Sequence, residues 1–537
     1  MATSRPDRQT QRYDRQLRLW NKSGQAALEH ARVLVVGASG LAGQILKNLV
    51  LPGLGGFTVL DGATVQKDDI GTNFFLEEAS VGKPYADELA RLVAELNPSV
   101  SHAARVESPA AVLDADPDFF TQFSLILCVR QPREVQERVA ALGWEHTPAI
   151  PVLCAHTSGF QGLFQVSVRE LGIVETHPES LVDLRLTRPF DELSAYAASF
   201  DMDTTDSMQR SHIPYVVLLL RALHDWKEEH GTLPASSSRA EFLAFLRKRR
   251  PESDSENYDE AHAALAQHVW RPLQSPAVPP NVAGVLGDVQ AREISAKTPL
   301  FWLLVAALRK FVDEAQCLPL SGALPDMKAT SATYVALQHI YVAKARRDLD
   351  TFQRHLDGVL RQAGVDRSEV GLDDDQVRTF VKHAAHLRLV RGRRLEQQRA
   401  DPDVGAMALA FADPVNPVTV QYLVAFFGAD TFYTKHGRYP GQAPDAQLDE
   451  DNAALLREAM QYAADVHLEL SKDDVEKLAD ACREMVRGAQ TDLSSTAAFL
   501  AGIVAQETIK VLTVQYIPLD NTCVYDGVSQ AIGSIRL

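Results

Sequence analysis

The sequence is poor in cysteine and contains no long hydrophobic run. Its 537 residues include five cysteines, widely spaced and without a CxxC pair. This spacing argues against a disulfide framework and against a cysteine-ligated zinc site. No uninterrupted apolar run reaches the roughly 18 residues that span a membrane. The N-terminal stretch MATSRPDRQTQRYDRQ also lacks the apolar segment of a secretory signal. We therefore expect a protein located inside the cell.

Positive charge is in deficit as well. Lysine and arginine number 54 against 70 aspartates and glutamates, a formal net charge of −16. Such a balance disfavours nucleic acids and anionic membranes as the main partners. The hydrophobic content of 46% is that of an ordinary globular protein. A chain of this length is too long for one core, so we expect about two to four domains.

The region 32–61, RVLVVGASGLAGQILKNLVLPGLGGFTVLD, carries the clearest pattern. A β-branched run over 33–36 predicts a buried strand, and a glycine-rich turn beginning at Gly37 follows it. Helical spacing of apolar residues over 41–50 and a second strand over 57–60 then lead to Asp61. A strand, a glycine turn at a helix N-terminus and an acid about 20 residues further on indicate a nucleotide-binding unit. In such a unit, backbone amides and the helix dipole face a phosphate.

The glycine turn departs from the G-x-G-x-x-G pattern. Read from Gly37, it has Ser39 at the second glycine and Ala42 at the third, whereas Gly40 lies between them. A side chain at these positions hinders the close approach of the backbone to a phosphate. The sequence therefore predicts the fold of a nucleotide-binding unit with a degenerate site.

The pattern of elements changes twice along the chain. Strands and helices alternate over the first 170 residues, which predicts a mostly parallel α/β sheet. From about residue 175, long amphipathic helical stretches dominate, and α/β character returns near Asp492, with strands expected over 516–519 and 522–525. We predict a Rossmann-like α/β domain split by a large, mainly helical insertion. The expected parts are a disordered N-terminus, the first α/β part, the insertion and the second α/β part, at 1–11, 12–172, 173–487 and 488–537. The expected long helices are 215–229, 240–249, 300–314, 331–363, 374–390 and 418–433.

An arginine-rich segment, RYDRQLRLW, directly precedes the nucleotide-binding unit. Charged runs of this kind are most often solvated helix starts. Its position keeps a second interpretation open, in which an arginine of this segment is directed at a phosphate.

Several segments together resemble the adenylation fold of the ubiquitin-like-modifier-activating enzymes, which is shared with the ThiF and MoeB proteins. They are RYDRQLRLW, the glycine-turn unit, VGK with its following helix, and AAFLAGIVAQETIKVL. Segments such as ESLVDLRLTRPFDEL and GRYPG resemble the regulatory subunits of neddylation-activating enzymes within that family. This resemblance implies a eukaryotic cell, with the protein in its cytoplasm, its nucleus or both. The resemblance implies a heterodimer whose catalytic subunit binds ATP and Mg²⁺. That subunit adenylates the C-terminus of a ubiquitin-like modifier and then accepts the modifier on a cysteine. These steps lie upstream of cullin modification.

The resemblance also implies that this chain does not itself adenylate. Active members carry an arginine in the loop after the acid, where this chain has GTNFFLEE and retains only Asn73. They carry a lysine where Tyr85 stands here, with Lys83 a weak substitute. They also have an aspartate for the metal after the strand SLILC, where this chain has Arg130 nearby. We therefore predict a degenerate nucleotide site, with no catalytic residue, no metal and no nucleotide of its own.

By position in this family, Arg15 is the residue that reaches across the dimer to the ATP of the partner, and Arg12 is a weaker second candidate. The insertion resembles a catalytic-cysteine domain without its cysteine, since neither Cys317 nor Cys482 has basic neighbours in the sequence that would activate a thiol. The partner interface is expected in the helices around 325–348 and 497–510. The residues predicted there are Tyr334, Leu337, Gln338, Tyr341, Ala497, Ala501 and Gln506.

Two other functions fit parts of the sequence. An autonomous adenylating or sulfur-carrier-activating enzyme would use the same fold, but it should retain the loop arginine, the lysine and the metal aspartate. A dinucleotide-dependent oxidoreductase would account for the glycine turn and Asp61, but not for RYDRQ or for the return of α/β character at the C-terminus.

Overall fold

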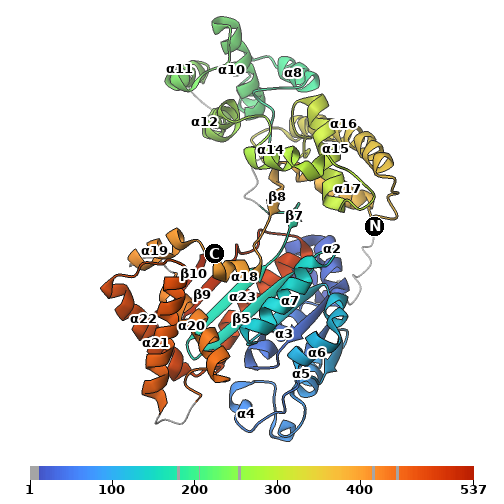
Figure 1. Cartoon of the computed structure of the whole chain (residues 1–537). Coiled ribbons are helices and arrows are strands. Elements are labelled where there is room, and N and C mark those ends of the chain that lie inside the picture. The colour runs from blue at the N-terminus through green and yellow to red at the C-terminus, as the bar shows by residue number, and fades with distance from the viewer. Residues whose placement is uncertain (1–10, 178–181, 205, 252–254, 414–417, 443–446) are drawn as a thin grey trace. The chain divides into compact units, whose positions relative to one another are not determined.

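The computed structural model describes residues 11–177, 182–204, 206–251, 255–413, 418–442 and 447–537. The chain divides into two units (Figure 1). Unit 1 combines Met1–Leu171 with Val390–Leu537, and unit 2 is Gly172–Leu389. The predicted segment 1–11 lies outside the described residues except for Gln11.

Unit 1 is built on one eight-stranded sheet with the order β10-β9-β6-β5-β4-β1-β2-β3. The five strands from β3 to β5 are parallel, whereas β6, β9 and β10 add antiparallel pairs at the other edge. This confirms the predicted Rossmann-like sheet. The strands are β1 Arg32–Val36, β2 Gly56–Leu60, β3 Ser101–Arg105, β4 Leu125–Val129, β5 Val152–Ser158, β6 Gln161–Ser167, β9 Thr522–Asp526 and β10 Ala531–Ile535.

Helices cover both faces of this sheet because successive strand residues point to opposite sides. Val33 and Val35 pack in a core with α2, α3, α5 and α23, whereas Leu34 and Val36 pack in a second core with α6, α7 and α18. The helices concerned are α2 Asp14–His30, α3 Gly40–Val50, α5 Tyr85–Ala94, α6 Pro109–Ala115, α7 Arg133–Glu145, α18 Leu395–Ala400 and α23 Ser494–Thr513, with the short α4 Asp69–Thr72 in the loop after β2.

The helical insertion ends about a hundred residues earlier than predicted, at Leu389 instead of residue 487. A third core joins the helices after Val390 to Leu163 of β6 and Val524 of β9, so these helices belong to unit 1. Sequence periodicity identifies a helix but not the surface it packs against, which explains the wrong boundary. These helices are α19 Val404–Ala412, α20 Val420–His436, α21 Leu448–Asp465 and α22 Lys472–Gly488.

Unit 2 is helical, as predicted, with two hydrophobic cores of its own. The predicted helix over 374–390 stops at Lys382, and Arg388–Val390 is instead a short strand, β8, that pairs with β7 Leu171–Ile173. The helices are α8 Asp191–Ala198, α9 Ser207–Ser211, α10 Tyr215–His230, α11 Arg239–Lys248, α12 Glu256–Leu265, α13 Arg271–Gln274, α14 Pro280–Gly287, α15 Leu300–Ala315, α16 Ser331–Ala363 and α17 Asp374–Lys382.

Helix α23 is long and apolar enough, by length and composition, to cross a membrane. In this structure 56% of its most apolar 18-residue stretch is buried. The helix packs against α3 and α2. It is therefore a core helix of unit 1. The predicted strand at 516–519 is absent from this described part of the chain, whereas the strand predicted at 522–525 is β9.

Candidate functional site

The glycine turn connects β1 to α3 at the carboxyl edge of the parallel strands, where α/β proteins place their ligand sites. Gly37 has a φ of +102°, and a Cβ there would lie 2.3 Å from the carbonyl oxygen of Val129. Its N–H donates to the carbonyl of Leu60 at 2.9 Å. Gly37 is thus required by the packing of β1 between β2 and β4, whether or not a ligand binds.

The acid at the end of β2 is engaged with the turn itself. The Asp61 carboxylate accepts hydrogen bonds from the N–H of Ala38 at 2.7 Å and from the N–H of Ala63 at 2.6 Å. Burial raises the pKa of Asp61, and these two hydrogen bonds partly offset the rise. Both oxygens are used within the chain, so Asp61 stabilises the turn in this structure.

The first turn of α3 is capped by its own residues. The Ser39 hydroxyl accepts from the N–H of Ala42 at 3.2 Å, and the Ser39 carbonyl accepts from the N–H of Gly43 at 3.0 Å. Serine at the second glycine position is therefore an N-cap of the helix. Ala42 is fully buried beside it.

A carboxylate from the far end of the sequence lies at the same helix end. Asp492 accepts from the N–H of Leu41 at 2.9 Å across 451 residues of sequence, and it also accepts from the Thr157 hydroxyl. Arg130 completes the cluster, with its Nη1 3.3 Å from an Asp492 oxygen, and it donates to the carbonyl of Gln490. Asp492 is only 2% exposed. Sequence analysis did not find Asp492, Thr157 or Gln490, since no local pattern links them to the glycine turn.

The other predicted positions of the degenerate site are also paired within the chain. Asn73 donates to the Tyr85 hydroxyl at 3.2 Å and to the Ser39 carbonyl at 3.3 Å. Burial raises the pKa of the Tyr85 phenol, so it stays neutral. Lys83 lies on the surface and forms an ion pair with Glu88 at 3.5 Å. The structure thus brings Asn73 and Tyr85 to the glycine turn, whereas Lys83 is engaged elsewhere.

These residues do not fit ATP and Mg²⁺. The N–H of Leu41, which would face a phosphate, donates to Asp492. Arg130 forms an ion pair with Asp492 and would repel a metal ion. No step of an adenylation reaction can therefore be derived from this site.

The predicted trans-acting arginine lies at the opposite end of α3. Tyr13 is buried against Gly53, and its hydroxyl accepts from the amide of Asn97 at 3.1 Å. This anchor leaves Arg12 and Arg15 exposed on either side of Tyr13. Arg12 lies over the Tyr13 ring at 5.8 Å, and Arg15 forms no hydrogen bond or ion pair with the residues that the structure describes.

Four of the seven predicted interface residues are wrong, because their side chains are buried inside the chain. Leu337 and Tyr341 are 0% exposed in a core of unit 2, and the Tyr341 hydroxyl donates to the carbonyl of Leu184. Ala497 and Ala501 face the core between α23 and α3. The small-residue face of α23 therefore serves packing within the chain. Exposed or half-buried positions on the same helices are Tyr334, Gln338 and Gln506.

The cysteines are mostly buried. Burial raises the pKa of Cys482 to about 12, so this thiol does not ionise near neutral pH. Cys317 is partly exposed.

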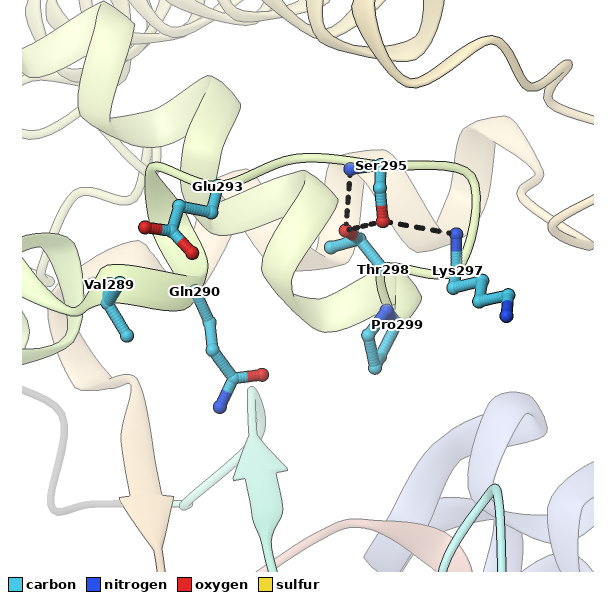
Figure 2. Close-up of a pocket in the computed structure, with 7 residues that line it drawn as sticks. All are labelled: Val289, Gln290, Glu293, Ser295, Lys297, Thr298 and Pro299. Carbon is cyan, nitrogen blue, oxygen red and sulfur yellow. Dashed lines mark hydrogen bonds between the residues drawn. The ribbon is translucent and has the colours of Figure 1, made fainter.

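A shallow pocket of about 210 Å³ lies in unit 2 (Figure 2). It is lined by Val289, Gln290 and the turn from Glu293 to Pro299. The polar groups of this turn bond to each other, as in the hydrogen bond from the N–H of Ser295 to the Thr298 hydroxyl at 2.9 Å. The pocket contains none of the residues predicted for the site.

Comparison with known proteins agrees with this architecture. Residues 13–537 match the model of the ThiF family. The chain belongs to the ThiF family. It is 35% identical to the NEDD8-activating enzyme E1 regulatory subunit of Gallus gallus, over 98% of both chains. It is also 30% identical to the NEDD8-activating enzyme E1 regulatory subunit AXR1 of Arabidopsis thaliana, over 98% of this chain and 96% of that protein. Within the ThiF family, the chain therefore belongs with the NEDD8-activating enzyme E1 regulatory subunits.

Solved structures match over a smaller part. The Escherichia coli tRNA N6-threonylcarbamoyladenosine dehydratase, solved with AMP, is 19% identical with a TM-score of 0.25, over 30% of this chain and 63% of that chain. A likeness of this size supports no statement about function.

Proposed function

We propose that this chain is the non-catalytic subunit of a heterodimeric NEDD8-activating enzyme. In the complex, a catalytic partner subunit binds ATP and Mg²⁺ and activates the C-terminus of the modifier NEDD8. This chain binds no nucleotide of its own and places Arg15 against the phosphates held by the partner. Arg12 is a second, weaker candidate for the same contact.

The observation that carries this function is the placement of Arg15. Tyr13 anchors the arginine segment beside Gly53, beyond the C-terminal end of α3, whereas the glycine turn is at the N-terminal end. The 11 residues of α3 separate the two ends by about 16 Å. In Figure 1, α2 and the α4 loop lie at opposite ends of unit 1. The segment that carries Arg15 thus lies at the other end of α3 from the glycine turn of its own chain.

The chemistry of an arginine suits a contact in trans. A guanidinium keeps its charge at all physiological pH values and can bind phosphate oxygens through two parallel hydrogen bonds. Arg15 is exposed and carries no ion pair among the described residues, so it is available to a partner. By contrast, Arg18 on the same helix is paired with Asp14 at 2.9 Å.

The decisive experiment measures NEDD8-dependent ATP–pyrophosphate exchange for the purified chain alone, for the catalytic subunit alone and for their mixture. We expect full activity only in the mixture. Exchange by the chain alone would instead identify an autonomous adenylating enzyme. Saturable binding of a nicotinamide cofactor would favour the oxidoreductase.

A further inference from the structure

The N-terminal end of α3 already holds an anion that belongs to the chain. The carboxylate of Asp492 lies on the N–H of Leu41, beside the hydroxyl of Thr157 and the guanidinium of Arg130. A main-chain amide at a helix N-terminus, a hydroxyl and an arginine are also the groups with which proteins bind phosphate. The cluster is therefore a complete anion site whose occupant is a side chain.

The backbone around this carboxylate is built for close approach. A Cβ at Gly40 would come within 2.5 Å of the carbonyl oxygen of Thr72 and 3.3 Å of an Asp492 oxygen. Glycine is thus needed at the first residue of α3, because only a residue without a side chain lets Thr72 and Asp492 lie this close to the backbone. Arg130 adopts a left-handed φ of +54°, a conformation that costs free energy for a residue with a side chain. In that conformation its guanidinium reaches both Asp492 and the Gln490 carbonyl.

Asp492 differs from an ordinary helix cap. A cap is supplied by the residue that precedes the helix, and Ser39 already has that role in α3. Asp492 comes instead from the segment before α23 and is buried together with Leu41 and Thr157, whereas Arg130 stays partly exposed. A buried carboxylate is costly unless it is paired, so the pairing with Arg130 and Leu41 accounts for its position.

Resting on the proposed function, we infer that Asp492 is a built-in substitute for a nucleotide phosphate. Its carboxylate takes the place of a phosphate at the N-terminal end of α3 and closes the nucleotide site of this subunit, with Arg130 as the counterion. The site is therefore latent, since an anion can enter only when the Asp492 carboxylate is removed.

The test compares thermal unfolding of the full chain with and without inorganic phosphate, against sodium chloride of equal ionic strength. In Asp492→Ala the vacated site should bind phosphate, and the midpoint of thermal unfolding should rise by about 1–2 °C at phosphate tenfold above its dissociation constant. Wild type should show no phosphate-specific rise. The matched control is Asp403→Ala, which removes a carboxylate that caps α19 through the N–H of Ala406 and has no arginine ion pair among the described residues.

A phosphate response of Asp492→Ala no larger than that of Asp403→Ala would overturn the inference. So would saturable binding of pyrophosphate to the wild-type chain. If Asp492→Ala does not fold, Asp492→Asn carries the same test, because it keeps the size and one acceptor oxygen but removes the charge that repels phosphate. Its midpoint should respond to phosphate more than that of wild type, and equal responses would refute the inference. The ATP–pyrophosphate exchange assay of the proposed function measures activity at the site of the partner. The phosphate-dependent unfolding measures binding to this chain, so the two tests can fail independently.

Discussion

The two ends of α3 show opposite arrangements of groups that can bind phosphate. At the N-terminal end, the amides of Ala38 and Leu41 and the guanidinium of Arg130 are all bound to carboxylates of the same chain. At the C-terminal end, the Tyr13 anchor leaves Arg15 exposed. The comparison shows that the groups of the glycine turn are paired within the chain, whereas Arg15 has no ion pair among the described residues.

The largest expected effect tests whether the glycine turn is kept for packing. In Gly37→Ala, the new Cβ would meet the Val129 carbonyl at 2.3 Å in a left-handed conformation, so we expect a loss of about 3 kcal/mol or more in the free energy of unfolding. The control is Gly502→Ala in α23, where a Cβ meets nothing within 4 Å. That variant should be stabilised by up to about 1 kcal/mol. Urea unfolding measures both, and a Gly37→Ala chain as stable as wild type would contradict the packing role.

The next effect concerns Arg15, at the C-terminal end of α3. Arg15→Ala should lower the ATP–pyrophosphate exchange of the heterodimer about 10- to 100-fold, since a charge-assisted contact to phosphate contributes about 1.5–3 kcal/mol. Its folding should be unchanged, because the side chain is exposed. Arg18→Ala, which loses only the surface pair with Asp14, is the control and should retain activity. Equal exchange rates for the two variants would exclude a trans contact through Arg15.

A further test uses pH and concerns His156, a buried histidine of β5 whose pKa is influenced by Arg130. Burial, with help from Arg399 and Arg130, lowers the pKa of His156 to about 3 from an unfolded value of 6.5. Below about pH 6.5 the unfolded chain binds a proton that the folded chain does not, so stability falls as the pH is lowered toward 3, by at most about 1.4 kcal/mol per pH unit.

His156→Gln removes this titration, and Gln136, which contacts the ring at 2.7 Å, can still pair with the new amide. The stability of the variant should therefore depend less on pH between 6 and 4. If the free energy of unfolding depends on pH equally in wild type and variant over this range, His156 is not buried in its neutral form.

The smallest effect comes from restoring a motif glycine. Ser39→Gly makes the turn more like G-x-G-x-x-G, but it should cost only a few tenths of a kcal/mol, whereas Ser39→Ala should cost about 1 kcal/mol through loss of the cap. We expect no gain in affinity for ATP, since the N–H of Leu41 stays on Asp492. Isothermal calorimetry with ATP checks this, and tight binding by Ser39→Gly would show that Ser39, not Asp492, closes the site.

The sequence was informative where a signal is local. The strand, glycine turn and helix at 32–50 and the apolar helix before the C-terminus follow from periodicity and turn chemistry, and all are present. The departures at Ser39, Tyr85 and Arg130 could also be read from position against the family pattern. Their side chains meet at the glycine turn or at Asp492, as the contacts show.

Contacts across long sequence separations could not be predicted. Periodicity marks an apolar face but does not say which surface covers it, so Tyr341 and Ala501 were assigned to a partner although the chain itself buries them. The same limit placed the end of the insertion at residue 487. The role of Asp492 cannot be predicted from the sequence, because its partner Leu41 is 451 residues away and no local pattern distinguishes Asp492 from a surface acid.

The antiparallel edge of the sheet has a consequence for biosynthesis. Strand β9 pairs with β6 and β10, and the hydrogen bond between Gln161 and Asp526 closes a loop of 365 residues. The ribosome synthesises β9 long after β6, so β6 has an unpaired strand edge until Thr522–Asp526 have emerged. Unpaired edges are sites of misassembly and aggregation. Unit 2, which is continuous in sequence, can fold during that interval, and ribosome-bound chains stopped before residue 522 should expose β6 to proteases.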